Sequence, residues 1–320
     1  MKILYMLSIV FLAIILTGCS QNQNANIPAI GQDDDKITIV TTIFPPYDFT
    51  RAVIGDKAEL TMLIKPGTEV HSYDPSPADI IKIQNADIFI YVGGENDKWV
   101  QAILDGMDVS NKKIIRLMDY VKTVEEEVVE GMQEGEKHSG HHEEITYDEH
   151  IWTSPENAIL LVDAIANVIC EVDSKNAEIY IQNAITYKAQ IKKVSDDIQA
   201  IADNATSKLL IFADRFPFRY FAKQFGFEYR AAFSACSTEI EASAGTLAYL
   251  INTVKNNHIS HVFYIEMSNQ NIARAISEQT GAKPLLMHSC HNITKNDFEA
   301  GVTYLSLMEQ NAKNLREGLK

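Results

Sequence analysis

The chain has 320 residues, of which 46% are hydrophobic and 22% charged, with 15 glycines and 9 prolines. This composition is typical of a globular protein and excludes a collagen-like, coiled-coil or largely disordered chain. The 43 acidic side chains outnumber the 28 Lys and Arg, giving a net charge of −15, which argues against nucleic acid as a partner. At roughly 150 residues per domain, the length favours two lobes.

The N-terminus has the pattern of a secretory signal. Lys2 precedes an apolar run from Ile3 to Leu16, which is too short for a comfortable membrane span, so residues 1–18 are expected to be a cleaved signal peptide. The ending Leu-Thr-Gly-Cys resembles the lipobox of bacterial lipoproteins and implies that Cys19 is lipidated. The polar segment 19–35 is then a flexible tether. The mature protein is expected to be extracytoplasmic and lipid-anchored to the cell membrane.

Strand-like and helical patterns alternate in the next segment. Short apolar runs predict strands at 37–43, 59–64, 87–92 and 113–117. The segments between them predict helices from Pro46 onward, at 76–86 and at 98–106. Strands of this kind with intervening helices indicate a parallel sheet covered on both faces. We therefore expect an N-terminal α/β lobe over residues 36–121.

The pattern changes after residue 121. Residues 122–149 are acidic and contain histidines without a sustained period, which is typical of an exposed loop. Residues 150–173 are expected to add a helix to the N-terminal lobe, with Ser154 as N-cap and Pro155 at the first helical position. Residues 174–205 predict a linker helix about 45 Å long. A single rigid connector predicts little movement between the lobes.

The alternation resumes over residues 206–320, the expected C-terminal lobe. Strands are predicted at 208–213, 227–233, 261–266 and 283–288, and helices near 217–225, 243–257, 270–280 and 297–317. The predicted fold class is α/β, with two doubly wound parallel-sheet lobes joined by one long linker helix.

The chain lacks the common catalytic motifs. It contains no phosphate-binding loop, no GxGxxG after the first strand, no GxSxG and no HExxH. The nearest match to the last, His-His-Glu-Glu-Ile-Thr at 141–146, has Thr146 where the second histidine is needed. We therefore expect a binding protein and not an enzyme. A secreted zinc hydrolase is the weaker alternative.

Two histidines stand out because stiff loops hold them. His71 follows the second predicted strand, and the carboxyl end of a parallel strand is where open α/β sheets place their ligands. His150 precedes Trp152 and the helix that begins at Pro155. Both positions suit coordination, although a surface or structural role is the alternative for either histidine alone.

Together, the segments GTEVHSYDPSPADI and YDEHIWTSPENA resemble those of the metal-specific solute-binding proteins of ABC transporters, the zinc- and manganese-binding cluster A-I. The resemblance covers essentially the whole mature chain. It implies that His71 and His150 are metal ligands, that Zn²⁺ (or alternatively Mn²⁺) is the transported ion, and that an ABC permease and its ATPase are partners. Neutral imidazoles suit zinc well and manganese acceptably.

One expected ligand is missing. The family usually supplies a third ligand, His or Glu, after the first strand of the second lobe, where this chain has Arg215. A guanidinium has no lone pair to give. Glu266 and His288 rank first as replacements, because both lie at predicted carboxyl ends of strands, although Glu266 could instead pair with Arg215. Further candidates are His291, Cys236, Glu239 and Glu241. A binding protein of the same fold for a metal chelate or small anion remains the alternative function.

The cysteines and the acidic loop complete the candidates. Cys170 lies in an apolar helical run and is expected to be a core thiol. Cys236 and Cys290 follow predicted strands and could form a disulfide, which an extracytoplasmic location permits. The competing interpretation is that Cys236 is a metal thiolate.

Related proteins carry a His-rich loop that gathers zinc weakly, and this role or that of a solvated linker fits His138, His141 and His142. An adhesin role also occurs in the family.

Overall fold

The computed structural model describes residues 36–68, 70, 73–133, 146–237 and 241–320. The predicted signal peptide, the tether and several predicted functional residues lie outside these ranges: Cys19, His71, His138, His141, His142 and Glu239. Within the described ranges, no helix is long and apolar enough to cross a membrane.

The first sheet has four parallel strands in the order β2-β1-β3-β4. They are β1 (Thr38–Thr41), β2 (Glu59–Met62), β3 (Ile88–Tyr91) and β4 (Lys113–Arg116). The helices of this part are α2 (Phe44–Ile54), α3 (Pro77–Asn85) and α4 (Lys98–Asp105). All four residues of β3 are buried, as expected for an inner strand of a sheet covered on both faces.

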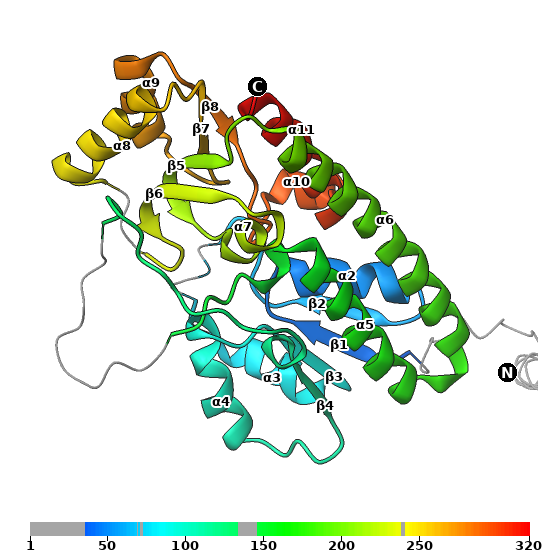
Figure 1. The fold of residues 1–320 in the computed structure, drawn as a ribbon. Helices are drawn as coiled ribbons and strands as arrows, with labels where there is room; N and C mark the ends of the chain where they lie inside the picture. Colours follow the sequence, from blue (N-terminus) through cyan, green and yellow to red (C-terminus); the bar gives the residue numbers. More distant parts are fainter. Residues whose placement is uncertain (1–35, 69, 71–72, 134–145, 238–240) are drawn as a thin grey trace, which may run out of the picture. The chain divides into compact units, whose positions relative to one another are not determined.

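The second sheet repeats this arrangement, with four parallel strands in the order β6-β5-β7-β8 (Figure 1). They are β5 (Leu209–Phe216), β6 (Glu228–Ser234), β7 (His261–Tyr264) and β8 (Lys283–Leu286). The accompanying helices are α7 (Arg219–Phe225), α8 (Ala244–Asn256), α9 (Asn271–Thr280), α10 (Lys295–Glu299) and α11 (Tyr304–Gly318). The predicted α/β fold class with two parallel sheets is confirmed.

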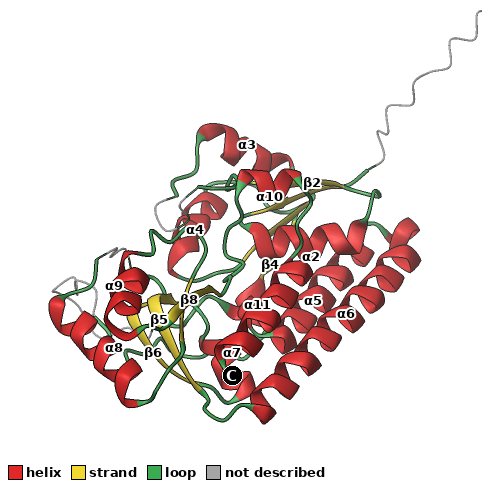
Figure 2. Cartoon of the chain, turned by 90° about the horizontal axis from the view of Figure 1, so that it is seen from above, coloured by secondary structure: helices red, strands yellow, loops and turns green. Residues whose placement is uncertain are grey.

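Two long helices connect the sheets in sequence. Ser154 caps α5 (Pro155–Val172), since its hydroxyl accepts the Asn157 N–H, and Pro155 occupies the first helical position, as predicted. After a short 3₁₀ turn, α6 (Ala177–Asn204) runs for 28 residues, or about 42 Å. It packs against α5 and α2 and also against α11, so it contacts helices from both ends of the chain (Figures 1 and 2).

The prediction of one continuous helix over 297–317 is wrong, because the structure has two helices there, α10 and α11. Gly301 interrupts it with a φ of 74°, a left-handed conformation that favours glycine. Thr303 then starts α11 with a capping box, in which its hydroxyl accepts the Ser306 N–H and the Ser306 hydroxyl accepts the Thr303 N–H. Helical periodicity continues across this break and therefore concealed it.

A buried carboxylate joins three of these helices. Asp48 of α2 is 1% exposed and pairs with Arg51. Its Oδ2 accepts the Tyr187 hydroxyl of α6 at 2.8 Å and the Tyr304 N–H at the start of α11 at 2.8 Å. Burial, together with Asp48, raises the pKa of Tyr187, which keeps this hydroxyl a donor. The network links α2, α6 and α11 through one side chain.

Replacement of Asp48 is expected to destabilise the whole molecule. Asp48→Ala leaves the Tyr187 hydroxyl and the Tyr304 N–H without their acceptor, and each unsatisfied buried group costs about 1–3 kcal/mol. We expect the free energy of unfolding in urea to fall by about 2–4 kcal/mol. The matched control is Asp196→Ala, which removes an exposed pair with Lys192 on α6 and should cost less than about 0.5 kcal/mol. Equal effects of the two substitutions would contradict the role of the network.

Candidate metal centre

Three side chains meet in a buried cluster. Glu149, His150 and His291 each offer a ligand atom, and these atoms all lie within 4.8 Å of one another. The histidine rings stand edge to face with centroids 4.9 Å apart. Two imidazoles and a carboxylate at this separation form a donor set that suits a divalent transition metal.

Asp148 fixes the orientation of His150. Its Oδ1 lies 3.0 Å from His150 Nδ1 and accepts the His150 N–H at 2.7 Å. The Asp148 carbonyl in turn accepts the Tyr220 hydroxyl at 2.7 Å, which ties this loop to α7. The carboxylate favours the imidazole tautomer with its proton on Nδ1. This tautomer leaves the Nε2 lone pair available for a metal.

Trp152 brings the second histidine to the first. The indole Nε1 donates a 2.8 Å hydrogen bond to the Ser289 carbonyl in the loop after β8. The Trp152 ring lies against both His150 and His291, with centroid distances of 5.3 and 5.1 Å. The backbone N–H of His291 donates to the Ser289 hydroxyl. Loops that are 141 residues apart therefore present their histidines side by side.

Glu149 is held by the segment that follows β3. Its Oε2 accepts the Asn96 N–H at 3.1 Å, and its Oε1 accepts the Asn96 side-chain amide. Gly94, with a φ of 137°, makes room for this carboxylate, because a Cβ there would lie 2.6 Å from Oε2. Burial raises the pKa of Glu149 to about 7, against the opposing influence of His150 and Asn96.

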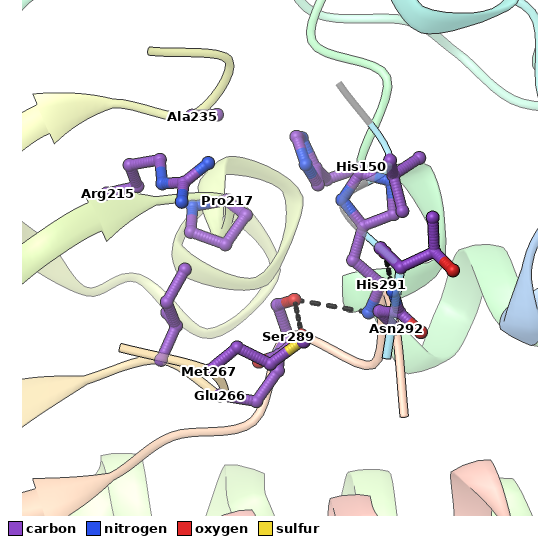
Figure 3. Close-up of a pocket in the computed structure, with 12 residues that line it drawn as sticks. His150, Arg215, Pro217, Ala235, Glu266, Met267, Ser289, His291 and Asn292 are labelled. Atoms are coloured by element: carbon purple, nitrogen blue, oxygen red, sulfur yellow. Dashed lines mark hydrogen bonds between the residues drawn. The ribbon is translucent and has the colours of Figure 1, made fainter. Parts of the chain in front are cut away.

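A cavity of about 50 Å³ lies in front of the two histidines. It is lined by residues after β2, at the end of β5 and after β6, β7 and β8, together with His150. These are carboxyl ends of parallel strands, where the sequence predicted the ligand to bind. Figure 3 shows His150 and His291 on one side of the cavity and Arg215 on the other. The cavity is also lined by Glu266, Met267 and Ser289, which Figure 3 shows below these side chains.

The structure places the two first-ranked replacement ligands differently. Glu266 lines the cavity, where its Oε2 accepts the Ser289 N–H and its Oε1 accepts the Ser289 hydroxyl. His288 does not line it. Its Nδ1 accepts the Cys290 N–H at 2.9 Å and lies 3.6 Å from Glu266 Oε2. In the described part of the chain, no ion pair joins Glu266 to Arg215, the alternative considered from the sequence.

The structure corrects the predicted disulfide, because Cys236 and Cys290 are free thiols in different surroundings. Cys290 is fully buried, and its sulfur lies 3.8 Å from the His288 carbonyl. Burial raises the pKa of Cys236, as do the neighbouring carboxylates, and its thiol is hydrogen-bonded to Glu126. A raised thiol pKa disfavours the thiolate that metal coordination requires. Cys170 is likewise a free thiol, packed at the edge of the main core.

Sequence reasoning ranked His288 above His291 and did not single out Glu149. His288 was favoured as the end of a strand, but β8 ends at Leu286, so the loop has already turned at His288. The signal that could have found His291 was its place in the loop after the last predicted strand, three residues from His288. Glu149 had one available signal, its position next to His150.

Comparisons with known proteins identify the family of this chain. The family model described as "Zinc-uptake complex component A periplasmic" (ZnuA) matches residues 39–318. The zinc-binding lipoprotein AdcA of Streptococcus pneumoniae is 32% identical over 306 residues, which cover 95% of this chain and 58% of AdcA. This chain belongs to the ZnuA family.

Other members match over nearly their whole length. The high-affinity zinc uptake system protein ZnuA of Bacillus subtilis is 27% identical, over 99% of this chain and 97% of that protein. The crystal structure of the Zn(II)-bound ZnuA-like domain of S. pneumoniae AdcA has a TM-score of 0.73 at 30% identity, covering 89% of this chain and 99% of that domain. The chain thus spans about three-fifths of AdcA, and the part it matches is the ZnuA-like domain.

The protonation of His150 provides a test of the site in the metal-free protein. Burial lowers the pKa of His150, but the carboxylates of Asp148, Glu149 and Glu126 raise it more, so its net pKa lies above the ordinary value. Because this folded-state pKa exceeds the unfolded value of about 6.5, protonated His150 stabilises the folded protein. This stabilisation is fully present below pH 6.5 and is lost as pH rises through the folded pKa.

We therefore expect an NMR titration of the His150 ring to have its midpoint above pH 6.5 in the wild type. In Asp148→Asn, which keeps the size of the side chain but removes its charge, the midpoint should move to lower pH. Asp163→Asn, which breaks a pair with Lys188 on α5 and α6, should leave it unchanged. A midpoint that is identical in Asp148→Asn and wild type would show that Asp148 does not control this imidazole.

Proposed function

We propose that this chain is the extracytoplasmic receptor of an ABC importer and binds Zn²⁺ in the cavity between the carboxyl ends of its two sheets. The observation that carries the proposal is the buried cluster of Glu149, His150 and His291. The names of the relatives support it, since AdcA is named a zinc-binding lipoprotein and B. subtilis ZnuA a high-affinity zinc uptake protein.

The proposed ligand set is His71, His150 and His291, with a carboxylate from Glu149 or Glu266. His71 follows Val70, which itself lines the cavity. This set is rich in imidazole, and imidazole suits zinc, whereas manganese prefers carboxylate, carbonyl and water oxygens. Zinc is therefore the favoured cargo over manganese.

Binding is expected to release protons. A metal requires neutral imidazoles and ionised carboxylates, while the raised pKa values of His150 and Glu149 favour the protonated forms in the empty site. Zinc must displace these protons, so its affinity is expected to rise with pH. Binding without turnover is the proposed activity, in keeping with a family of transport components.

Delivery requires a membrane partner. We propose that the chain is attached to the cell membrane through a lipid on Cys19 and docks on a permease that works with an ATPase. The lipoprotein name of AdcA supports the anchor, and the family description supports the extracytoplasmic location.

The first test of the proposal is metal content. Protein stripped with a chelator and re-equilibrated with equal zinc and manganese is expected to retain one zinc per chain in elemental analysis, with less than about a tenth as much manganese. Retention of manganese instead would overturn the metal assignment. Retention of neither metal would overturn the receptor proposal.

A second test separates the two histidines of the last loop. His291→Ala removes a cluster ligand and should weaken zinc binding at least about tenfold, measured by competition with a fluorescent chelator. His288→Gln keeps an acceptor for the Cys290 N–H and should change the affinity less than about threefold.

His261→Ala, on β7 and away from the cavity, serves as the neutral control. Thermal unfolding of each variant establishes that the fold is retained. A larger loss of affinity in His288→Gln than in His291→Ala would restore the ligand assignment made from the sequence.

A further inference from the structure

Arg215 occupies an unusual place for a metal-binding cavity. It lies near the end of β5 and lines the same cavity as His150 and His291. Figure 3 shows its guanidinium directed toward the two rings from the opposite side of the cavity. No other Lys or Arg is among the described residues that line this cavity.

The positive charge of Arg215 is not part of an ion pair within the cavity. Among the described residues, no carboxylate lies within ion-pair distance of its guanidinium. Asp214 is adjacent in sequence and its carboxylate attracts the Arg215 charge, but it does not line the cavity, and it also accepts hydrogen bonds from the N–H groups of Arg215 and Ile265 and from Ser268. Glu266 does line the cavity, but Ser289 holds both of its oxygens.

A dication in this cavity would face a permanent cation. The guanidinium cannot lose its proton and cannot donate a lone pair, so it repels the metal without coordinating it. The neutral histidines do not offset this repulsion, so only the carboxylates of Glu149 and Glu266 oppose it, and inside a small cavity it is screened less than in water. A second, negatively charged group between the metal and Arg215 would convert the repulsion into two attractions.

We propose that the metal binds together with a small oxyanion that bridges it to Arg215. Two oxygens of a carboxylate-like anion match the two parallel N–H groups of a guanidinium, and a remaining lone pair completes the coordination of the metal. The cavity of about 50 Å³ fits an anion of the size of formate or bicarbonate. This inference rests on the proposed function, because it names the form in which the same site takes zinc.

The anion dependence of zinc affinity tests this inference. Zinc binding to the wild-type protein is measured at free zinc concentrations fixed by a chelator buffer, with formate or with perchlorate at equal ionic strength. Perchlorate coordinates metals weakly and controls for general screening. Formate is expected to raise the affinity at least about tenfold over perchlorate.

Three variants identify the residue responsible. Arg215→Met removes the charge and should abolish the formate effect, while binding zinc in perchlorate at least as tightly as the wild type. Arg215→Lys keeps the charge without the planar fork and should show a smaller formate effect. Arg274→Met, which removes an exposed arginine on α9, should behave as the wild type does.

The outcomes separate this inference from the function on which it rests. Tight zinc binding with equal affinity in formate and perchlorate would overturn the bridging anion but keep the receptor, and would point to pairing of Arg215 with Glu266 in the loaded state. A formate effect that persists in Arg215→Met would also overturn it. Failure to bind zinc in either salt, in the wild type and in Arg215→Met alike, would overturn the proposed function itself.

Discussion

The site depends on the position of Trp152. Its indole N–H binds the Ser289 carbonyl, its own carbonyl accepts the Tyr304 hydroxyl, and its ring contacts both His150 and His291. One fully buried residue thus joins, through its indole and its backbone carbonyl, the loop before α5, the loop after β8 and the start of α11. Because the hydrogen bonds go to backbone groups, the spacing of the two imidazoles is set by the fold and not by the flexibility of their own side chains.

The carboxylates around the cluster prepare it for a cation. Asp97 accepts the N–H groups of Val92 and Gly93, and burial still raises its pKa to about 6, while that of Glu149 rises to about 7. Burying carboxylates costs free energy, and a bound cation lowers that cost by favouring the ionised forms. These carboxyl groups therefore favour their protonated forms more than ordinary carboxylates do, and a cation bound beside them would release the protons.

Local patterns predicted the elements well, and contacts between distant segments decided the site. The alternation of apolar runs with capped helices located the strands and gave the α/β class, and Ser154 with Pro155 marked the start of α5. His150 could be recognised from the sequence because the residues that mark it, Trp152 and Pro155, lie close to it along the chain. The pairing of His150 with His291 depends on the Trp152–Ser289 hydrogen bond, which has no signature in either segment. A two-residue error in the end of β8 was enough to favour His288.

The helices that flank the two sheets are linked to one another, and this bears on which ion the proposed site would favour. Asp48 ties α2, α6 and α11 together, so the helices that run beside both sheets share one buried network. In the proposed site, a frame of this kind would favour ions whose size and preferred geometry match the separation of the two histidines. Arg215, on another face of the cavity, follows a register shift in β5 and pairs with Phe233 of β6. The guanidinium lies at the end of a flexible side chain, so its charge can be compensated in two ways, by a change of rotamer toward Glu266 or by an anion that enters the cavity with the metal.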